Sequence, residues 1–581
     1  MKSRIQQVAG CGENNLKYYA NVRRLMDKPF YFGNTLAQDF LRLADNEWEL
    51  PHRNKDQAMM RDYSILSVGC GDLRNLVYTI ASLPNEFNGK LNITLCDFDA
   101  FVMARNVLFL YIMVAEADVL DIEKKLTTIW YSLRYSDEEN KIVREALKAL
   151  CDCKNGRALH EMTDGLIKMS DGEVQVLKQV WNGWHNGEHH IWHTFNVGRD
   201  PDCVKDVKSW HGIERLKCDE QKKSVLFLQR AQEVKNVRLR DDHPFMHRYS
   251  SDMWMQNGKF TTDRLEPKDL THDNVTLTGR LGYDFAKRYA GDQKVYPYMS
   301  SLENNHDDEH PPRYDSFMLQ DCRPPSQYPF FYCVQGDMNP YQVWDYIEAR
   351  DTGYDDHMEN FYFEYIRNCI NLTIELIREK RLSLKMTIME ARQLKFDEAE
   401  RFDRIFTSNL MDYFGTHPMV RKFGPLLNHS NKHAVLVMES LHWVESVKVL
   451  NGCMKGEVKL DHLIEYKLDD QRYNEDYHRE LMDSCDMQGS PPHRPCIDDY
   501  EYDVGDFIKH LKGMLMVTDS KDDSKTVPST KTLLQCDGFR MRDVRVGCNK
   551  VAPYRDIHRG RQGGIPGTER RTIEWTAIPS I

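Results

Sequence analysis

Short apolar runs alternate with helical patterns in two separate parts of the chain. In the first part the runs are SILSV at 64–68 and LNITLC at 91–96, each followed by a helical pattern. In the second part they are LKMTIM at 384–389, DRIFT at 403–407 and AVLVM at 434–438. Runs of this length, bounded by turn residues, are typical of buried parallel strands. Strands that alternate with helices predict an α/β protein with a doubly wound, mainly parallel sheet.

A long interval of different character, from about 120 to 380, separates the two groups of strands. Apolar residues recur at helical spacing from Ile122 to Leu133, and Ser136 with Glu139 forms a capping box before another helix. The middle, at about 290 to 345, is rich in Pro, Tyr and Asp, which predicts an extended connection. We therefore predict a single sheet that is interrupted by a long, mostly helical insertion.

These patterns divide the chain into six parts. We predict a lead-in over 1–60, the first half of a Rossmann-like core over 61–119, the insertion over 120–380, the second half of the core over 381–450, an extension over 451–518 and a largely disordered basic tail over 519–581. The tail prediction rests on composition, because DSKDDSKTVPSTK and the later RDIHRGRQGGIPGTERR are polar or rich in glycine and arginine.

Composition limits the cellular compartment and the kinds of partner that the sequence predicts. The formal net charge of −11 gives no reason to expect nucleic acid as a partner. The fifteen cysteines are scattered without a CxxC pair, which disfavours a zinc ribbon and a disulfide scaffold. No apolar leader opens the chain, and the longest apolar run, VLFLYIMVA at 107–115, is too short to cross a bilayer. We expect a reduced cytoplasmic protein without a membrane partner.

The first strand runs into a glycine loop, ILSVGCGDLRN. Gly69 and Gly71 match the start of a dinucleotide-binding GxGxxG loop, but Arg74 stands at the third glycine position, so NAD is disfavoured. The loop has no Walker lysine and is therefore not a P-loop.

The order of the signals instead resembles the class I methyltransferases. In that fold an acidic residue at the end of the second strand, here Asp97, holds the ribose of S-adenosylmethionine, and Glu390 after the third strand would lie beside the adenine amine. The resemblance implies a site for S-adenosylmethionine or S-adenosylhomocysteine, and no metal. The candidate cofactor-binding residues are Gly69, Cys70, Gly71, Asp97, Phe98, Glu390, Ala391 and Asn409.

The loop departs from the methyltransferase pattern at the reactive end. Ser67 replaces the acidic residue that would engage the methionine amino group, and Leu73 replaces the third glycine of GxGxG, where it is expected to crowd that end of the pocket. Arg74 with Asn75 is expected to anchor the loop, and Asp99 to cap the next helix. No catalytic residue is assigned, since no general base stands out at the strand ends.

Three further constellations have competing interpretations. WHNGEHHIWH at 184–193 spaces His189 and His193 as a metal pair if helical, but a polar surface turn is the favoured interpretation. MNPYQ at 338–342 resembles an amino-methyltransferase motif, but it lies before the third strand and is interpreted as a proline turn. Asn409, with Asp412, either faces the pocket or caps the following helix.

Five motifs carry a more specific resemblance. They are GNT at 33–35, GCGDLRN at 69–75, CDFD at 96–99, ARN at 104–106 and ERFDRIFTSN at 400–409. Over roughly residues 28 to 450 the chain resembles a eukaryotic domain-of-unknown-function family that includes dynein axonemal assembly factor 3 and fungal MYND-finger-associated proteins. The resemblance implies a cytoplasmic protein linked in animals to preassembly of dynein arms, with dynein or chaperone assembly complexes as partners.

Two functions from different classes follow. The first is a scaffold or assembly factor built on a degenerate methyltransferase-like fold. The second is an active S-adenosylmethionine-dependent methyltransferase whose acceptor the sequence does not reveal. Ser67 and Leu73 favour the scaffold, because a fold alone does not confer an activity.

Overall fold

The computed structural model describes most of the two predicted sheet halves and part of the chain around them. The described residues are 33, 35–48, 55–132, 134–186, 191–193, 272–276, 332–334, 343–345, 348–349, 358–441, 443, 507–508, 510–512, 515, 529–542, 549–552 and 570–578.

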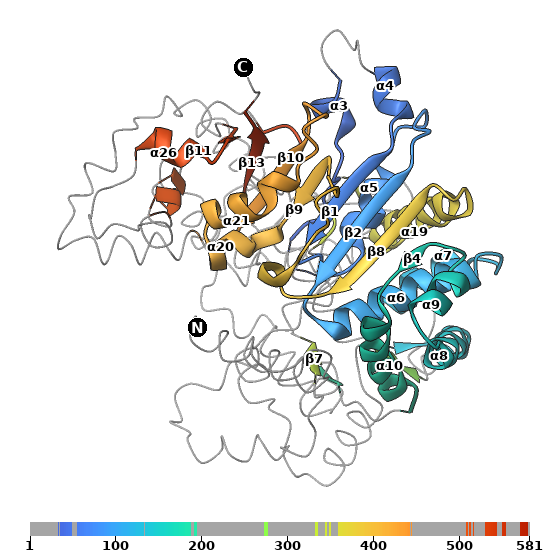
Figure 1. Cartoon of the computed structure of the whole chain (residues 1–581). Helices are drawn as coiled ribbons and strands as arrows, with labels where there is room; N and C mark the ends of the chain where they lie inside the picture. The colour runs from blue at the N-terminus through green and yellow to red at the C-terminus, as the bar shows by residue number, and fades with distance from the viewer. Residues whose placement is uncertain are drawn as a thin grey trace, which may run out of the picture.

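One nine-stranded sheet, in the order β11-β12-β13-β10-β9-β1-β2-β8-β4, forms the centre of the molecule (Figure 1). In chain order its strands are β1 (Tyr63–Val68), β2 (Leu91–Asp97), β4 (Ile167–Lys168), β8 (Leu382–Ile388), β9 (Arg404–Phe406), β10 (Val435–Ser440), β11 (Gln535–Cys536), β12 (Phe539–Met541) and β13 (Arg571–Ala577). The six strands from β10 to β4 are parallel, and β11, β12 and β13 are added to β10 in antiparallel pairs. The prediction of a single, mainly parallel sheet is confirmed.

The register shows how the sheet is completed across the insertion. All seven residues of β2 pair with β8, so Leu91 lies beside Leu382 and Asp97 beside Ile388. On the other side, Ser67 of β1 lies between Leu95 of β2 and Phe406 of β9. Strands that are far apart in the sequence are therefore direct neighbours at the centre of the sheet.

Helices cover both faces of the sheet, as a doubly wound arrangement requires. One face packs against α5 (Arg74–Ala81), α6 (Ala100–Ala115), α7 (Ile122–Tyr131) and α19 (Met358–Arg378). The other packs against α20 (Met411–Phe414) and α21 (Thr416–Phe423). Alternation along the strands separates the two cores, since Val437 belongs to the first and its neighbours Leu436 and Met438 to the second.

The apolar run at 107–115 is part of α6, which is almost completely buried. Asp99 caps this helix, because its carboxylate accepts hydrogen bonds from the N–H groups of Phe101 and Val102, at 2.9 and 3.3 Å. The predicted cap and the predicted buried helix are both confirmed. Within the described part of the chain, no helix is long and apolar enough to span a bilayer.

The first part of the insertion is helical, as predicted. It contains α7, α8 (Asp137–Asp152), α9 (Gly156–Met162) and α10 (Asp171–Asn186), and α8 begins with the predicted Ser136–Glu139 capping box. The insertion also supplies the edge strand β4. Beyond this short strand the carboxylate of Glu173 accepts the N–H of Ile388 at 2.9 Å, so the edge of β8 is covered.

The prediction of a largely disordered tail over 519–581 is wrong for the residues that the structure describes there. They form α26 (Thr530–Leu534), the β11–β12 hairpin and β13, and β13 pairs with β10 from Ser440↔Arg571 to Leu436↔Trp575. Ile573 and Trp575 are completely buried. The arginine- and glycine-rich composition upstream concealed this seven-residue strand. Residues 519–528, 543–548, 553–569 and 579–581 lie outside the described part.

The remaining elements are short. They are α3 (Leu43–Asn46), α4 (Lys55–Met60), β3 (Arg134–Tyr135) with β6 (His272–Asp273), β5 (Ile191–His193) with β7 (Tyr332–Val334), and the 3-10 turns η3 (Ala391–Gln393), η4 (Ser408–Leu410) and η5 (Gly424–Leu426).

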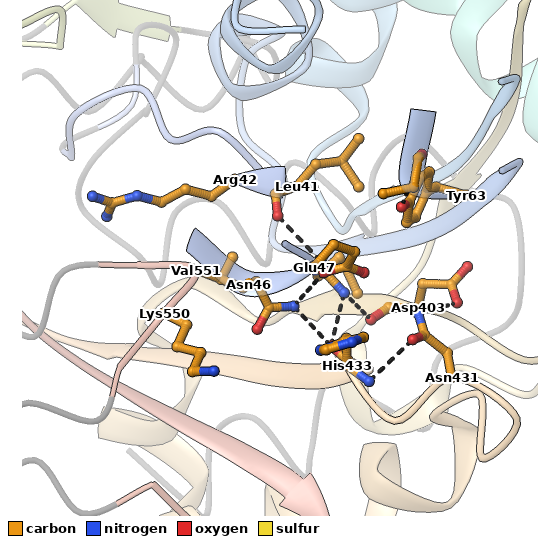
Figure 2. A network of polar contacts seen from close by, with 12 residues as sticks. Leu41, Arg42, Asn46, Glu47, Tyr63, Asp403, Asn431, His433, Lys550 and Val551 are labelled. Carbon is orange, nitrogen blue, oxygen red and sulfur yellow. Dashed lines mark hydrogen bonds and ion pairs between the residues drawn. The ribbon is translucent and has the colours of Figure 1, made fainter. Parts of the chain in front are cut away.

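A buried polar network ties the N-terminal segment to the start of β9 (Figure 2). The guanidinium of Arg404 donates from Nη2 to the Glu47 carboxylate at 2.7 Å and to the Leu41 carbonyl at 3.2 Å. Both members of the ion pair are buried, with side chains 0% and 4% exposed. Asn46 donates to Glu47 at 2.7 Å and to the carbonyl of His433 at 2.9 Å. The described residues of the predicted lead-in are therefore part of the fold.

Candidate functional site

The predicted cofactor residues lie at the carboxyl ends of four adjacent strands. Gly69 follows β1, Asp97 ends β2, Glu390 follows β8 and Asn409 follows β9. Because these strands are parallel neighbours, their ends meet at one edge of the sheet. After β1 the next strand, β2, is added on one side, and after β9 the next strand, β10, is added on the other side. The position between β1 and β9 is therefore the topological switch point of the sheet, which is where open α/β sheets form crevices.

The glycine loop adopts a conformation that favours glycine. Gly69 and Gly71 have φ angles of +67° and +58°, in the left-handed region. The N–H of Gly71 donates to Oδ2 of Asp97 at 2.9 Å, and its carbonyl accepts from Nδ2 of Asn106 at 2.7 Å. Further back, the N–H groups of Gly69 and Cys70 both donate to the carbonyl of Cys96. The loop is thus held on both sides by the second strand and by α6.

Both carboxylate oxygens of Asp97 accept hydrogen bonds from main-chain N–H groups. Oδ2 accepts from Gly71, and Oδ1 accepts the N–H of Asp99 at 3.0 Å. The residue is only 7% exposed. A carboxylate oxygen can accept two hydrogen bonds, so a ribose hydroxyl could be added only beside these internal bonds or in place of them.

Arg74 anchors the loop to the N-terminal motif GNT, as predicted. Its guanidinium donates to the carbonyl of Thr35 at 2.9 Å and to the Thr35 hydroxyl at 2.8 Å, and it forms a buried ion pair with Asp72. Gly33, with φ +71°, has its missing side-chain position filled by this guanidinium. The N–H of Gln38 donates to Oδ1 of Asn75 at 3.0 Å. These contacts fix the position of the loop.

The apolar residues of the loop face the core. Cys70 is 5% exposed, with its sulfur 3.9 Å from the sulfur of Met103. Burial raises the pKa of the Cys70 thiol well above its usual range, which makes it a poor nucleophile. Phe98 is partly buried. The expectation that Leu73 crowds the pocket is wrong, because its side chain is 1% exposed and packs in the core at the start of α5.

Glu390 lies at the expected edge and interacts with its own turn. Its carboxylate accepts the N–H of Arg392 at 3.2 Å, which caps η3, and forms an ion pair with Nε of the same arginine at 2.8 Å. The side chain is 23% exposed. Ala391 is buried beneath it.

Of the two proposed roles of Asn409, the helix cap is wrong, and the role in the pocket stays a prediction. Asn409 makes no helix cap, because the residue before α20 is Leu410 and no side chain caps that helix. Asn409 instead hydrogen-bonds to Tyr413 one turn later. The carboxylate of Asp412 accepts the hydroxyl of Ser440 and the N–H of Leu441, so it caps the end of β10.

The turn after β9 lies directly against the glycine loop. A Cβ atom at Gly69 would be 3.6 Å from Cβ of Ser408 and 3.8 Å from Cγ of Leu410. Ser408 has a φ angle of +47°, which is rare for a residue with a side chain. The ends of β1 and β9 are therefore packed against each other at the switch point.

The structure gives no support to the metal pair. The helix α10 ends at Asn186, and His193 belongs to β5, while His189 lies outside the described residues. Within the part of the chain that is described, no group of three or more His, Cys, Asp or Glu side chains could hold a metal ion. MNPYQ at 338–342 also lies outside that part.

The geometry defines an α/β protein with a closed glycine loop at the switch point of its sheet. Residues 31–134 match the family model of a domain of unknown function, DUF4470. The match includes the motifs GNT, GCGDLRN, CDFD and ARN, which meet around the loop. No curated protein matches the chain, and no solved structure does.

Proposed function

We propose that this chain is a cytoplasmic assembly factor or scaffold built on a degenerate methyltransferase-like fold. Its family resemblance links that role to preassembly of axonemal dynein arms, with dynein or chaperone complexes as partners. In this proposal the sheet and its loop give a rigid framework, and the surfaces around it bind protein.

The strand order supports the methyltransferase-like part of the proposal. The five strands predicted from the sequence are, in chain order, β1, β2, β8, β9 and β10. In the sheet they lie side by side in the order β8-β2-β1-β9-β10, which is 3-2-1-4-5 in terms of that chain order. This is the order of a doubly wound nucleotide-binding sheet, with its crevice between the first and fourth strands.

The internal hydrogen bonds and ion pairs of the polar side chains in and around the loop support the scaffold part of the proposal. Asp97 binds Gly71 and Asp99, Arg74 binds Thr35 and Asp72, and Glu390 binds Arg392. Each of these three side chains is therefore already bound within the chain. A ligand would have to share these side chains with their internal partners or replace those partners, and this lowers its net affinity.

A second candidate, an active S-adenosylmethionine-dependent methyltransferase, is favoured by one observation. Two left-handed glycines at the end of β1 with a carboxylate at the end of β2 are the groups that approach a nucleoside in that fold. The two proposals therefore differ in whether a cofactor binds and whether its methyl group is transferred.

Titration of the full chain with S-adenosylhomocysteine in a calorimeter, together with transfer of labelled methyl from S-adenosylmethionine to cell extract, separates them. The scaffold proposal expects weak or undetectable binding and no transfer. Transfer that is abolished by Gly71→Arg would establish the enzyme. Gly538→Arg is the matched control, because Gly538 also has a positive φ, +87°, and lies in the β11–β12 turn with open space around it.

The link to dynein arms has its own test. In a ciliated cell that expresses this protein, depletion should lower the amount of assembled axonemal dynein arms. Rescue by Asp97→Asn, which weakens a ribose site but retains an acceptor for Gly71, would support a role without catalysis. Normal dynein arms after depletion would exclude the link.

A further inference from the structure

A cavity of about 300 Å³ lies at the opposite edge of the sheet from the glycine loop. It opens at the amino ends of β2 and β8, where Lys90 precedes β2 and Arg381 precedes β8. Its volume is at the lower end of the range for small-molecule sites. Nothing in the proposed function uses this edge, so the inference below is independent of it.

The cavity combines an apolar floor with a basic rim. The floor includes the partly buried side chains of Val114, Ala117 and Ile377, which a ligand can cover, above the buried Leu91 and Leu382. Four basic residues contribute to the lining, Lys90, Arg378, Lys380 and Arg381, against one acidic residue, Asp164. A site of this composition suits a molecule with an apolar body and one anionic group.

The basic residues differ in how far the fold already uses them. The guanidinium of Arg381 is already used within the fold, since it donates to the main-chain carbonyls of Gly89 and Phe87. Arg378 pairs with the fully exposed Asp118 at 2.9 Å. Lys90 is exposed and its ammonium group has no partner among the described residues. Lys380 forms an ion pair with Asp164 at 3.2 Å, its one partner in the part of the chain that the structure describes, and the two side chains are 70% and 67% exposed.

Lys380 and Asp164 both have a left-handed backbone, which is costly for a residue with a side chain. Each residue follows the end of a helix, α19 and α9, in the left-handed region, with φ angles of +56° and +48°. Glycine is the residue that ends helices in this conformation at least cost. An exposed ion pair adds little to stability, so it does not offset the strain of two side chains. Strained residues of this kind are typical of sites that bind something.

We propose that this cavity binds a small amphipathic organic anion, with its apolar body on the floor and its charged group between Lys380 and Lys90. In the free protein Lys380 forms an ion pair with Asp164, and this ion pair breaks when the anion binds to Lys380. The exchange replaces one exposed ion pair by another, and the gain comes from covering the apolar floor.

Calorimetry on the full chain with sodium octanoate tests the proposal. Octanoate should bind with a dissociation constant on the order of 1 mM or tighter. Octanol, which lacks the charge, and inorganic phosphate, which lacks the apolar body, should each bind more weakly. Equal binding of octanol or of phosphate would overturn the proposal, as would no binding of octanoate.

Two variants assign the binding to this cavity. Lys380→Gly should raise the melting temperature, because it relieves the left-handed strain, and weaken octanoate by about threefold to fivefold. Arg42→Gly is the matched control, since Arg42 has a φ angle of +42°, does not line the cavity and should leave octanoate binding unchanged. Lys90→Ala gives a second measure without a backbone change. Octanoate binding that is unaffected by both lysine variants would overturn the assignment.

Discussion

Removal of the Asp403 carboxylate should strongly destabilise the fold, because four donors from two other segments, 61–64 and 428–431, converge on it. Oδ1 accepts from the guanidinium of Arg61 at 2.9 Å and from the side-chain amides of Asn428 and Asn431, at 3.0 and 2.8 Å. Oδ2 accepts the N–H of Ser64 at 3.0 Å. Asp403 is 2% exposed and precedes β9, so it joins the starts of β1 and β9.

The expected magnitude follows from what each substitution leaves unpaired. Asp403→Ala leaves the partly buried N–H of Ser64 and two side-chain amides without this acceptor, at about 1–3 kcal/mol each before relaxation, and removes the ion-pair partner of the partly exposed Arg61. Since such losses are not additive and water can enter, we expect a total of about 3–5 kcal/mol. Asp403→Asn can keep an oxygen at the Oδ1 position for three donors and should cost about 1–3 kcal/mol.

Urea denaturation followed by tryptophan fluorescence measures the effect, with circular dichroism as a second probe to check that the transitions coincide. Asp397→Ala is the control, because Asp397 is an exposed aspartate in the preceding loop and should change stability by no more than about 0.5 kcal/mol. A loss below about 1 kcal/mol for Asp403→Ala, or equal losses for the alanine and asparagine variants, would refute the reasoning.

Three shorter predictions test other parts of the fold by the same denaturation assay. Gly33→Ala should cost about 2–3 kcal/mol, because its Cβ would lie 1.9 Å from Nη1 of the anchored Arg74; Gly538→Ala, with open space around it, should cost about 1 kcal/mol. Trp575→Ala should cost about 3–5 kcal/mol, since the indole is completely buried in β13; a cost near that of the exposed Ile578→Ala would mean that the strand is not formed. Burial lowers the pKa of His510 to about 4, and neither ring nitrogen has a hydrogen-bond partner among the described residues. Stability from the neutral ring is therefore fully present above pH 6.5 and lost as the pH falls toward 4, by about 3 kcal/mol in all. His510→Phe should remove this loss, and a wild-type to variant difference that is constant from pH 7 to 4 would contradict it.

The centre of the sheet could be predicted because its strands are buried on both faces. β1, β2 and β10 read as continuous apolar runs, and a helical pattern separates each from the next. The edges could not be predicted in the same way. β4 and β11 have two residues each, too few to show a period, and β13 follows a stretch whose composition predicts disorder.

The position of the candidate site could be predicted, but the partners of its residues could not. A motif that directly follows a strand must lie at the carboxyl edge, and this places Gly69 and Asp97 from the sequence alone. The side chain of Leu73 could not be placed from the sequence, because the direction in which it points depends on where α5 begins, one residue later. The charged pair Lys380–Asp164 gave no sequence signal, since its members are more than two hundred residues apart.

The internal bonds of the glycine loop also determine how a ligand at that edge would act. A nucleoside that took the place of the N–H groups of Gly71 and Asp99 on the Asp97 carboxylate, which accepts them at 2.9 and 3.0 Å, would break the hydrogen bond that closes the loop. Its binding would therefore be coupled to opening of the loop, and the Gly71 amide would exchange its hydrogen faster in the complex than in the free protein. A preformed nucleoside site would show the reverse, with slower exchange on binding. Hydrogen exchange at this one amide thus distinguishes a loop kept closed for structure from a loop that is ready to receive a cofactor.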